Sequence, residues 1–504
     1  KNTIEELSLP KWKESIKYLH SSSQHNNFKS KYFKRIAFDE IFSNLIILSN
    51  NRSKIKRIIK QPKIIDNKLF ERIKKNIKFD LTDDQLLALK EINKDLISNK
   101  KMFRLLQGDV GCGKTIVSLI AAGNVVNDNY QCGLMAPTDI LAKQHYETAI
   151  NLFKDINIKI GYLSGKLLTK EKKIIKEKLI NGEIDILIGT HSLFYEGIKF
   201  KRLGLVIIDE QHRFGVEQRM MLSKKGGNEC DTLLMSATPI PRTIMLTFYG
   251  DLDVTKIINK PNFRKKILTI AKPEKKINEI YRFLKDQIQK DNQIFWVCPL
   301  ITDSKILNFT SVEKRFKEIN KIFPNKTGLI HGNLKKGEKD KILKDFLKKK
   351  IKIIVSTTVI EVGVDFPNAN LIVIENSEKF GLAQLHQLRG RVGRGSKQGI
   401  CILLYKNKLT ENSTKRLKIL KSNDNGFAIA EEDMKLRGYG DLIGYQQSGE
   451  KFFKIAKPEF HSDLFDYAEK KIKELNHSII DLHKYELLLK LFDKAELINS
   501  DNNN

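Results

Sequence analysis

Residues 102–115 read MFRLLQGDVGCGKT, and this stretch decides the fold. A short apolar run leads into the pattern GxxxxGK[ST], and the apolar residues that follow favour a helix. In a strand, glycine loop and helix of this order, backbone N–H groups and the start of the helix converge on a phosphate. The expected phosphate-binding loop consists of Gly108, Asp109, Val110, Gly111, Cys112, Gly113, Lys114 and Thr115.

Two side chains of this loop have expected roles in nucleotide chemistry. Lys114 is placed to neutralise the β and γ phosphates of ATP, and the Thr115 hydroxyl is placed to hold Mg²⁺. Cys112 has two readings. It is either a small filler residue or, if exposed in this electropositive setting, a reactive thiol whose alkylation abolishes ATPase activity.

Apolar runs on both sides of the loop predict the fold class, which is α/β with parallel sheets. One set of short runs lies between residues 102 and 236, a second set lies between 293 and 405, and helical patterns separate the runs. A basic stretch with Pro261, from 251 to 275, is a candidate linker. The expected domains are a helical segment 1–76, an ATP-binding domain 77–255, a second sheet domain 256–415 and a helical C-terminal region 416–504.

Composition narrows the class of protein without naming a site. The 504 residues carry a formal net charge of +30, which fits either a polyanionic partner such as nucleic acid or the amino-acid bias of an AT-rich gene. Five scattered cysteines without a CxxC pair favour neither a disulfide framework nor a zinc site, and indicate a reducing cytosol. No apolar run approaches a membrane span, and no signal peptide opens the sequence.

A second polar element follows the apolar run LGLVII (203–208), where Asp209 and Glu210 stand at the expected end of a strand. Downstream of a phosphate-binding loop, such a pair completes the site of an NTPase. Asp209 is expected to bind Mg²⁺ through water, and Glu210 to orient and deprotonate the attacking water.

The chain resembles superfamily 2 helicases, whose motifs appear in order. The DExH box would be Asp209, Glu210, Gln211 and His212. APTDILAKQH (136–145), GTHSL (189–193), SATPIPR (236–242), IHGNL (330–334), TTVIEVGVDFPNA (357–369) and QLRGRVGR (387–394) resemble its other motifs.

This resemblance implies two RecA-like domains with ATP between them. It implies that Gln85, in LTDDQ, reads adenine, and that Arg391 and Arg394 face the γ phosphate across the cleft as arginine fingers. His212 either links the ATP site to the facing domain or is a satisfied polar residue. For His331 and His386 the second reading is the default.

Three longer stretches resemble the RecG family of branch-migration helicases: DEQHRFGVEQR (209–219), ATPIPRTIMLTFYGDLDV (237–254) and ENSEKFGLAQLHQLRGRVGRG (375–395). In that family a helical hairpin and loop after the second sheet domain convert domain movement into a pull on duplex DNA. The resemblance places the coupling residues at Arg416, Arg437 and Gln447, and FAIAEEDMKL (427–436) is predicted to be a helical arm. Tyr439, Asp441 and Gln446 depart from the family pattern, in which RGPGE replaces RGYGD and an arginine precedes the final glutamine.

The resemblance implies an ATP-driven translocase on double-stranded DNA that remodels stalled forks and Holliday junctions. It also implies a monomer in the bacterial cytosol, associated with the nucleoid and with single-strand-binding protein, and without a membrane. LPKWKESIKYLH (9–20) resembles the segment after the family's strand-splitting wedge, and no stretch of the 504 residues resembles the wedge itself. ATP hydrolysis on DNA with fork unwinding and without it therefore stay open as alternatives. Two alternatives stay open: an ATP-gated DNA-binding or remodelling subunit, and a translocase like a transcription-repair coupling factor.

Overall fold

The structure is a computed structural model of the chain. The described residues are 5–21, 27–77, 79–165, 167–190, 193, 197–210, 226–237, 252–261, 264–299, 305–332, 334–357, 366, 368–393, 395, 397–406, 409–437, 453–475 and 481–493.

The first lobe is built on a parallel sheet of seven strands in the order β3-β4-β2-β5-β6-β1-β7. Its strands are β1 Phe103–Gly108, β2 Gln131–Met135, β3 Ile160–Leu163, β4 Ile186–Gly189, β5 Leu203–Ile208, β6 Asp231–Ser236 and β7 Asp253–Ile257. Its helices are α4 Asn67–Asn76, α5 Asp83–Leu96, α6 Lys114–Asn127, α7 Asp139–Leu152 and α8 Thr169–Asn181, with the short η3 Gly227–Glu229.

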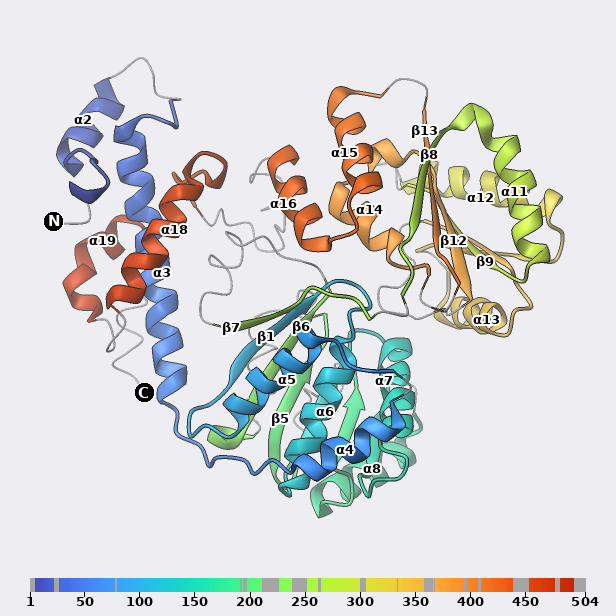
Figure 1. Cartoon of the computed structure of the whole chain (residues 1–504), viewed down its shortest axis with the longest axis horizontal. Coiled ribbons are helices and arrows are strands. Elements are labelled where there is room, and N and C mark those ends of the chain that lie inside the picture. Colours follow the sequence, from blue (N-terminus) through green and yellow to red (C-terminus); the bar gives the residue numbers. More distant parts are fainter. Residues whose placement is uncertain are drawn as a thin grey trace.

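The second lobe repeats this plan with a parallel sheet of six strands in the order β10-β11-β9-β12-β13-β8. Its strands are β8 Leu268–Pro273, β9 Gln293–Val297, β10 Thr327–Ile330, β11 Ile353–Ser356, β12 Ala369–Ile374 and β13 Ile400–Tyr405. Around it lie η4 Glu274–Lys276, α11 Ile277–Gln289, α12 Lys305–Ile322, α13 Lys336–Leu347, η5 Ser377–Lys379, α14 Leu382–Arg389, α15 Glu411–Ser422 and α16 Gly426–Arg437. The expected fold class, two tandem α/β sheet domains, is confirmed (Figure 1).

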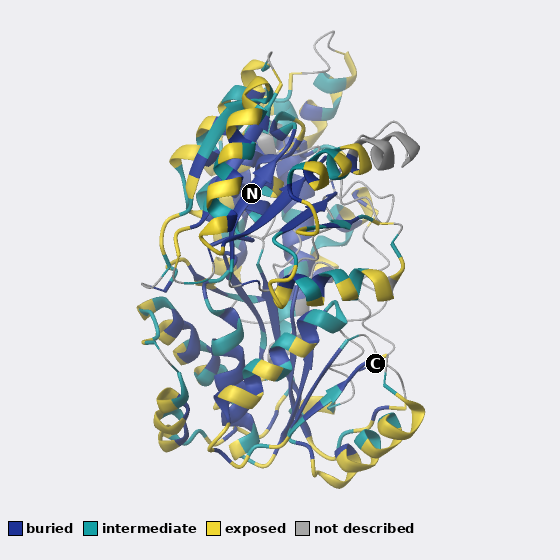
Figure 2. Ribbon diagram, turned by 90° about the vertical axis from the view of Figure 1, so that its right-hand side faces the viewer, coloured by how far each residue is buried: buried dark blue, intermediate teal, exposed yellow. Residues whose placement is uncertain are grey.

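Each sheet is covered by apolar packing on both faces. In β5, Leu205 and Ile207 belong to one apolar cluster of the first lobe, whereas Val206 and Ile208 belong to the other. Successive side chains of a strand point to opposite faces, so a strand between two layers of helices must be apolar at every position. Figure 2 shows the result, with buried residues along the strands and exposed residues on the outer sides of the helices.

A third body joins the two ends of the described chain. It contains α2 Trp12–Ser21, α3 Lys31–Arg57, α18 Pro458–Leu475, η6 Leu482–Tyr485 and α19 Glu486–Leu491. Phe38 and Ile41 of α3 share an apolar cluster with Leu464 and Phe465 of α18. The buried Glu40 carboxylate of α3 accepts hydrogen bonds from the backbone N–H groups of residues 454, 455 and 456, at 2.6, 2.9 and 2.6 Å.

The expected helical segment 1–76 is therefore divided between two bodies. Helix α3 packs with the C-terminal helices and α2 packs on α3, while α4 packs on the first lobe, where Leu69 and Ile73 enter its core. The linker expected at 251–275 is shorter than its basic composition indicated. Strand β7 completes the first sheet and β8 edges the second, which leaves residues 258–267 between them. The expected arm at 427–436 corresponds to α16.

A buried ion cluster attaches the segment between α3 and α4 to the first lobe. The Lys63 and Lys60 ammonium groups lie 2.6 and 3.1 Å from one carboxylate oxygen of Asp231, and all three side chains are fully buried. The second Asp231 oxygen accepts the Met102 N–H at 2.7 Å. Two cations thus depend on one carboxylate for their charge compensation.

All five cysteines, Cys112 among them, lie buried. Burial raises the pKa of Cys230 and Cys401 to about 12. The reactive-thiol alternative for Cys112 required an exposed side chain, so the structure supports the filler reading. Among the described helices, none is long and apolar enough to cross a membrane.

Replacing Asp231 by alanine is expected to destabilise the first lobe by about 3–5 kcal/mol, because two buried ammonium groups lose their partner. Urea unfolding followed by circular dichroism measures the effect. The matched control is Glu177→Ala, which removes an exposed ion pair to Lys173 and should change stability by less than about 0.5 kcal/mol. Equal effects for the two variants would contradict the role of the cluster.

Titration with Ellman's reagent is expected to find no rapidly reacting thiol in the native protein and five after unfolding, because burial shields the thiols from the reagent. The unfolded sample is the internal control. A thiol that reacts at once in the native protein and is protected by ATP would restore the reactive reading of Cys112.

Candidate active site

The phosphate-binding loop lies between β1 and α6, as the sequence predicts. Gly111 and Gly113 have φ values of 76° and 89°, a left-handed backbone that glycine adopts without strain. A Cβ atom at Gly113 would lie 2.1 Å from Nε2 of Gln85. Both the backbone conformation and the packing therefore require glycine at this position.

Lys114 begins α6, and its side chain curls over the loop. Its Nζ donates hydrogen bonds to the carbonyl oxygens of Gly108 at 2.6 Å and Asp109 at 3.1 Å. The ammonium group is buried at the helix N-terminus, where a phosphate would find it together with the backbone N–H groups. Thr115 follows and lines the same cleft.

Gln85 supports the loop from behind. Its Oε1 accepts the Thr82 N–H at 2.9 Å, which forms a capping box at the start of α5, and its Nε2 donates to the Cys112 carbonyl at 2.7 Å. The side chain is fully buried. Both ends of the amide that was expected to read adenine are thus engaged within the protein.

Asp209 and Glu210 follow the end of β5 and line the cleft. An Asp209 oxygen lies 2.8 Å from Nε2 of His145 in α7, and the other accepts the Glu210 N–H at 2.9 Å. Burial alone would raise the pKa of Asp209, but the bond from His145 and the nearby charges outweigh it and lower this pKa. Asp209 therefore remains an anion.

The pKa of Glu210 is shifted in the opposite direction to that of Asp209. Burial and then the charge of Asp209 raise its pKa, and Lys114 and Arg391 offset this only in part. Its φ of 50° is rare for a residue with a side chain, and such conformations cost about 1–3 kcal/mol and cluster at functional sites. A buried carboxylate with a raised pKa is suited to accept a proton.

Arg391 reaches this site from the second lobe. It follows α14, is buried, and lines the cleft with Lys114, Asp209 and Glu210. The cleft measures about 950 Å³ and has walls from both lobes. The structure therefore brings together the expected loop, carboxylates and one finger.

Several expected residues lie outside the described part of the chain: Gln211, His212, Arg394, Tyr439, Asp441, Gln446, Gln447 and the side chain of Arg437. Arg416 is described and lies away from the cleft. Its guanidinium donates to the carbonyl oxygens of Phe380 at 2.7 Å and Glu378 at 3.0 Å, which ties α15 to the segment before α14.

Sequence reasoning missed three residues at the loop. The Lys260 ammonium lies 2.7 Å from the Asp109 carboxylate, and a Cβ atom at Gly111 would lie 1.9 Å from Nη1 of Arg264. His386, read by default as a satisfied polar residue, contacts Asp109 from the second lobe at 2.8 Å. The basic character of 258–267 was the available signal for the first two.

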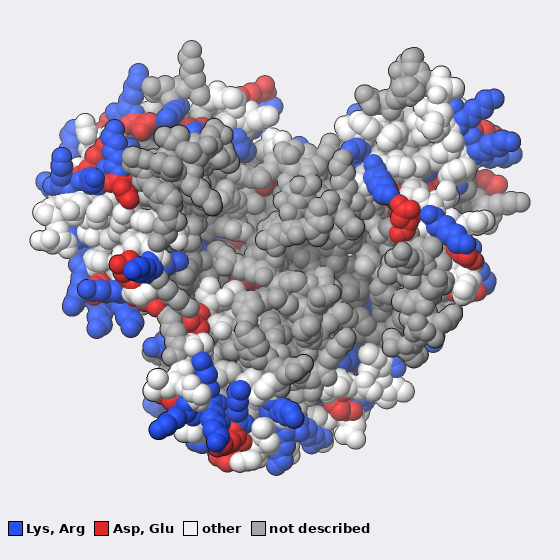
Figure 3. Space-filling view, turned by 180° about the vertical axis from the view of Figure 1, so that it is seen from behind, with Lys and Arg blue, Asp and Glu red and all other residues white. Residues whose placement is uncertain are grey.

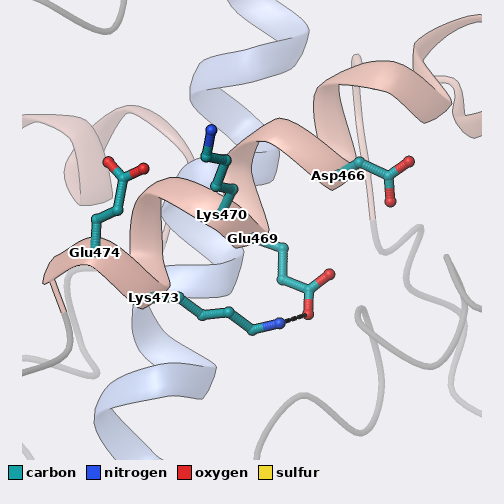
Figure 4. A pocket seen from close by; sticks show the side chains of 5 residues that line it. All are labelled: Asp466, Glu469, Lys470, Lys473 and Glu474. Atoms are coloured by element: carbon teal, nitrogen blue, oxygen red, sulfur yellow. Dashed lines mark ion pairs between the residues drawn. The ribbon is translucent and has the colours of Figure 1, made fainter.

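Another hollow, of about 390 Å³, lies on α18 (Figure 4). Its lining is charged, with a Lys473–Glu469 ion pair of 2.5 Å among the labelled side chains. Its wall comes from a single helix, whereas the interlobe cleft has a glycine loop, buried carboxylates and cations. No group of three or more metal-ligating side chains occurs within the described ranges.

Three family matches follow the architecture. Residues 82–247 match the DEAD/DEAH box helicase family, and residues 275–396 match the helicase conserved C-terminal domain. Residues 422–493 match the C-terminal part of domain 3 of ATP-dependent DNA helicase RecG.

Curated relatives named ATP-dependent DNA helicase RecG cover nearly the whole chain. The Thermotoga maritima protein is 45% identical over 455 residues, which are 89% of this chain and 58% of the relative. The Aquifex aeolicus protein is 41% identical over 513 residues, which are 98% of this chain and 64% of the relative. The chain thus spans about three fifths of the length of these relatives.

Solved structures of helicases also resemble this chain. A RecG structure bound to a three-way DNA junction superimposes with a TM-score of 0.77 at 41% identity, covering 93% of this chain and 61% of that one. Dbp5 of S. cerevisiae, at 17% identity and a TM-score of 0.52, covers 72% of this chain and 92% of its own, and shares the fold alone. With this identity, these domain matches and this shared structure, the chain belongs to the RecG family of DNA helicases.

Proposed function

We propose that the chain is an ATP-hydrolysing motor that translocates on double-stranded DNA and remodels branched DNA such as stalled forks and Holliday junctions. The observation that carries the proposal is the composition of the interlobe cleft. Lys114 and Glu210 of the first lobe and Arg391 of the second line one cavity. A site divided between two lobes changes when they move, so hydrolysis and movement are linked.

Each of these groups has a role in the proposed hydrolysis. The loop N–H groups and Lys114 bind the β and γ phosphates, and Arg391, with Arg394, compensates the charge that develops on the γ phosphate. Glu210 orients the attacking water and accepts its proton, consistent with its raised pKa. Mg²⁺, when bound, would be held by the Thr115 hydroxyl and, through water, by the anionic Asp209, and would compensate phosphate charge.

The proposed partner is branched double-stranded DNA. Support comes from the relative that was solved on a three-way DNA junction and from the net charge of +30. Among the coloured side chains of the face in Figure 3, Lys and Arg occur on all three bodies. Cations spread in this way suit contacts to the DNA backbone, which supply grip without reading sequence.

Coupling to DNA is assigned to the hairpin α15–α16 and the residues after it. Arg416 fixes the hairpin to the second lobe, and Arg437 and Gln447 are proposed as the further coupling residues. We also propose a monomer in the bacterial cytosol, associated with the nucleoid and with single-strand-binding protein.

The second candidate is an ATP-gated DNA-binding or remodelling subunit without strand separation. The comparisons do not favour it, because the curated relatives at 45% and 41% identity are named ATP-dependent DNA helicases. A translocase like a transcription-repair coupling factor is less favoured, because residues 422–493 match a domain of RecG itself.

Replacing Glu210 by glutamine is expected to lower the kcat for ATP hydrolysis about 10²–10⁴-fold, the range for loss of a positioned general base. The affinity for ATP should remain, because the loop and Lys114 are intact. Steady-state phosphate release and binding of a fluorescent ATP analogue measure the two quantities. The control is the exposed Glu177→Gln. A Glu210→Gln enzyme with full activity would remove Glu210 from the catalytic site.

Branched duplex DNA is expected to stimulate ATP hydrolysis, and DNA affinity should fall steeply between about 50 and about 200 mM salt, because phosphate contacts release counterions. ATPase rates and DNA binding are measured across that range, together with displacement of a labelled strand from a fork. Glu210→Gln is the negative control for displacement.

The three outcomes of this experiment are distinct. Stimulation with displacement supports the motor on branched DNA. Stimulation without displacement supports the ATP-gated subunit. An ATPase rate that is the same with and without DNA contradicts both proposals.

A further inference from the structure

Helix α14 lies between the phosphate-binding loop and the hairpin α15–α16. Its C-terminal end meets the loop directly, because a Cβ atom at Gly390 would lie 3.1 Å from Cβ of Val110. Arg391, the cleft residue of the second lobe, follows Gly390 at once. A displacement of α14 relative to the loop therefore displaces Arg391.

One hydrogen bond joins the side chains of α14 to the loop. Nε2 of His386 lies 2.8 Å from Oδ1 of Asp109, and both side chains are almost wholly buried. Arg389 donates from Nη2 to Nδ1 of His386 at 2.9 Å, so Nδ1 is the acceptor and Nε2 carries the proton. The imidazole therefore donates to Asp109, and its tautomer is fixed by the arginine one turn later.

Asp109 is placed so that a conformational change of the phosphate-binding loop on nucleotide binding would move its carboxylate. It belongs to the phosphate-binding loop but is not among the residues that line the cleft, and its carboxylate also accepts the Val110 N–H at 2.7 Å. Lys260, from the interlobe linker, compensates its second oxygen at 2.7 Å. A change of loop conformation moves this carboxylate relative to donors on the linker and on the second lobe.

The opposite side of α14 is bonded to the hairpin. Arg389 donates from Nη1 to the Leu420 carbonyl in the last turn of α15 at 2.5 Å, and lies 3.4 Å from Asp424 in the turn before α16. Asp433 of α16 accepts the N–H of Leu382, the first residue of α14, at 3.0 Å. The hairpin thus holds α14 at both of its ends.

We propose that His386 is a positioning residue, whose hydrogen bond to Asp109 couples the conformation of the phosphate-binding loop to α14 and through it to both Arg391 and the hairpin. This inference rests on the proposed function and deepens it. It replaces the default reading of His386 as a merely satisfied polar group. A satisfied histidine needs only one partner within its own lobe, whereas His386 joins a loop in one lobe to an arginine that bonds the hairpin in the other.

The first test measures the coupling between the nucleotide site and the hairpin in the absence of DNA. Hydrogen–deuterium exchange of residues 411–437 is measured with and without ADP, after ADP affinity has been determined for each variant. In the unaltered protein ADP should change the exchange of the hairpin. In His386→Ala, affinity should stay within about threefold, because the contact lies outside the cleft, while the hairpin response is lost.

The second test is a double-mutant cycle on ATPase activity. His386→Ala and Asp109→Ala should each lower kcat about tenfold, as for loss of a hydrogen bond to a charged group, and the double variant should be no slower than the worse single variant. His386→Gln, whose amide can still donate, should restore part of the rate. His483→Ala, an exposed histidine on η6, is the control and should leave the rate unchanged. Thermal melting of every variant identifies loss of folding.

The outcomes separate this inference from the proposed function. If the unaltered protein binds no nucleotide, both are overturned. If it binds ADP but its hairpin does not respond, or if His386→Ala responds like the unaltered protein, the coupling role is overturned and the motor proposal stands. Multiplicative losses in the double variant likewise overturn the coupling role.

Discussion

Charge compensation at the seam between the two lobes is the constraint on which the active site depends. Lys114, Asp209, Glu210 and Arg391 are all buried there. A buried charge without a partner costs roughly several kcal/mol, so the two carboxylates depend on the cations near them, and Glu210 depends on Arg391 as well as on Lys114. Because Arg391 belongs to the second lobe, the electrostatic balance of the first lobe changes whenever the lobes separate. The same side chains that suit phosphate chemistry therefore also make the site sensitive to lobe position.

The sequence predicted those parts of the site that depend on local chemistry. The glycine spacing of residues 108–115 indicated the loop because two of its positions require a left-handed backbone. Asp209 and Glu210 were found because they follow an apolar strand. Contacts across the chain were beyond this reasoning. His145 and Asp209 are 64 residues apart, and Asp109 and His386 are 277 apart. Which partner a polar side chain meets is decided by packing of distant elements, and no local pattern records it.

Gln85 shows that a motif can locate a residue without predicting the contacts of its side chain. Gln85 lies in the first turn of α5, and its amide is turned onto the loop backbone, so its contacts are those of a support for Gly113 and Cys112. Cys112 had two interpretations, a small filler residue or an exposed reactive thiol. Its burial in the packing behind the loop supports the filler interpretation. A motif identifies where a residue stands in the chain, whereas its neighbours determine which way its side chain points.

The shared core of the first and last helices has a consequence for how this protein is made. Residues 31–57 present their apolar face to residues 453–492, which the ribosome adds about 400 residues later. At about 5–20 residues per second, that face waits roughly 20 to 80 seconds for its partner. Both sheet lobes have the time to fold during this delay, while the face of α3 that packs on α18 stays uncovered. That face of α3 is therefore an exposed apolar surface, suited to chaperone binding, until residues 453–492 have been synthesised.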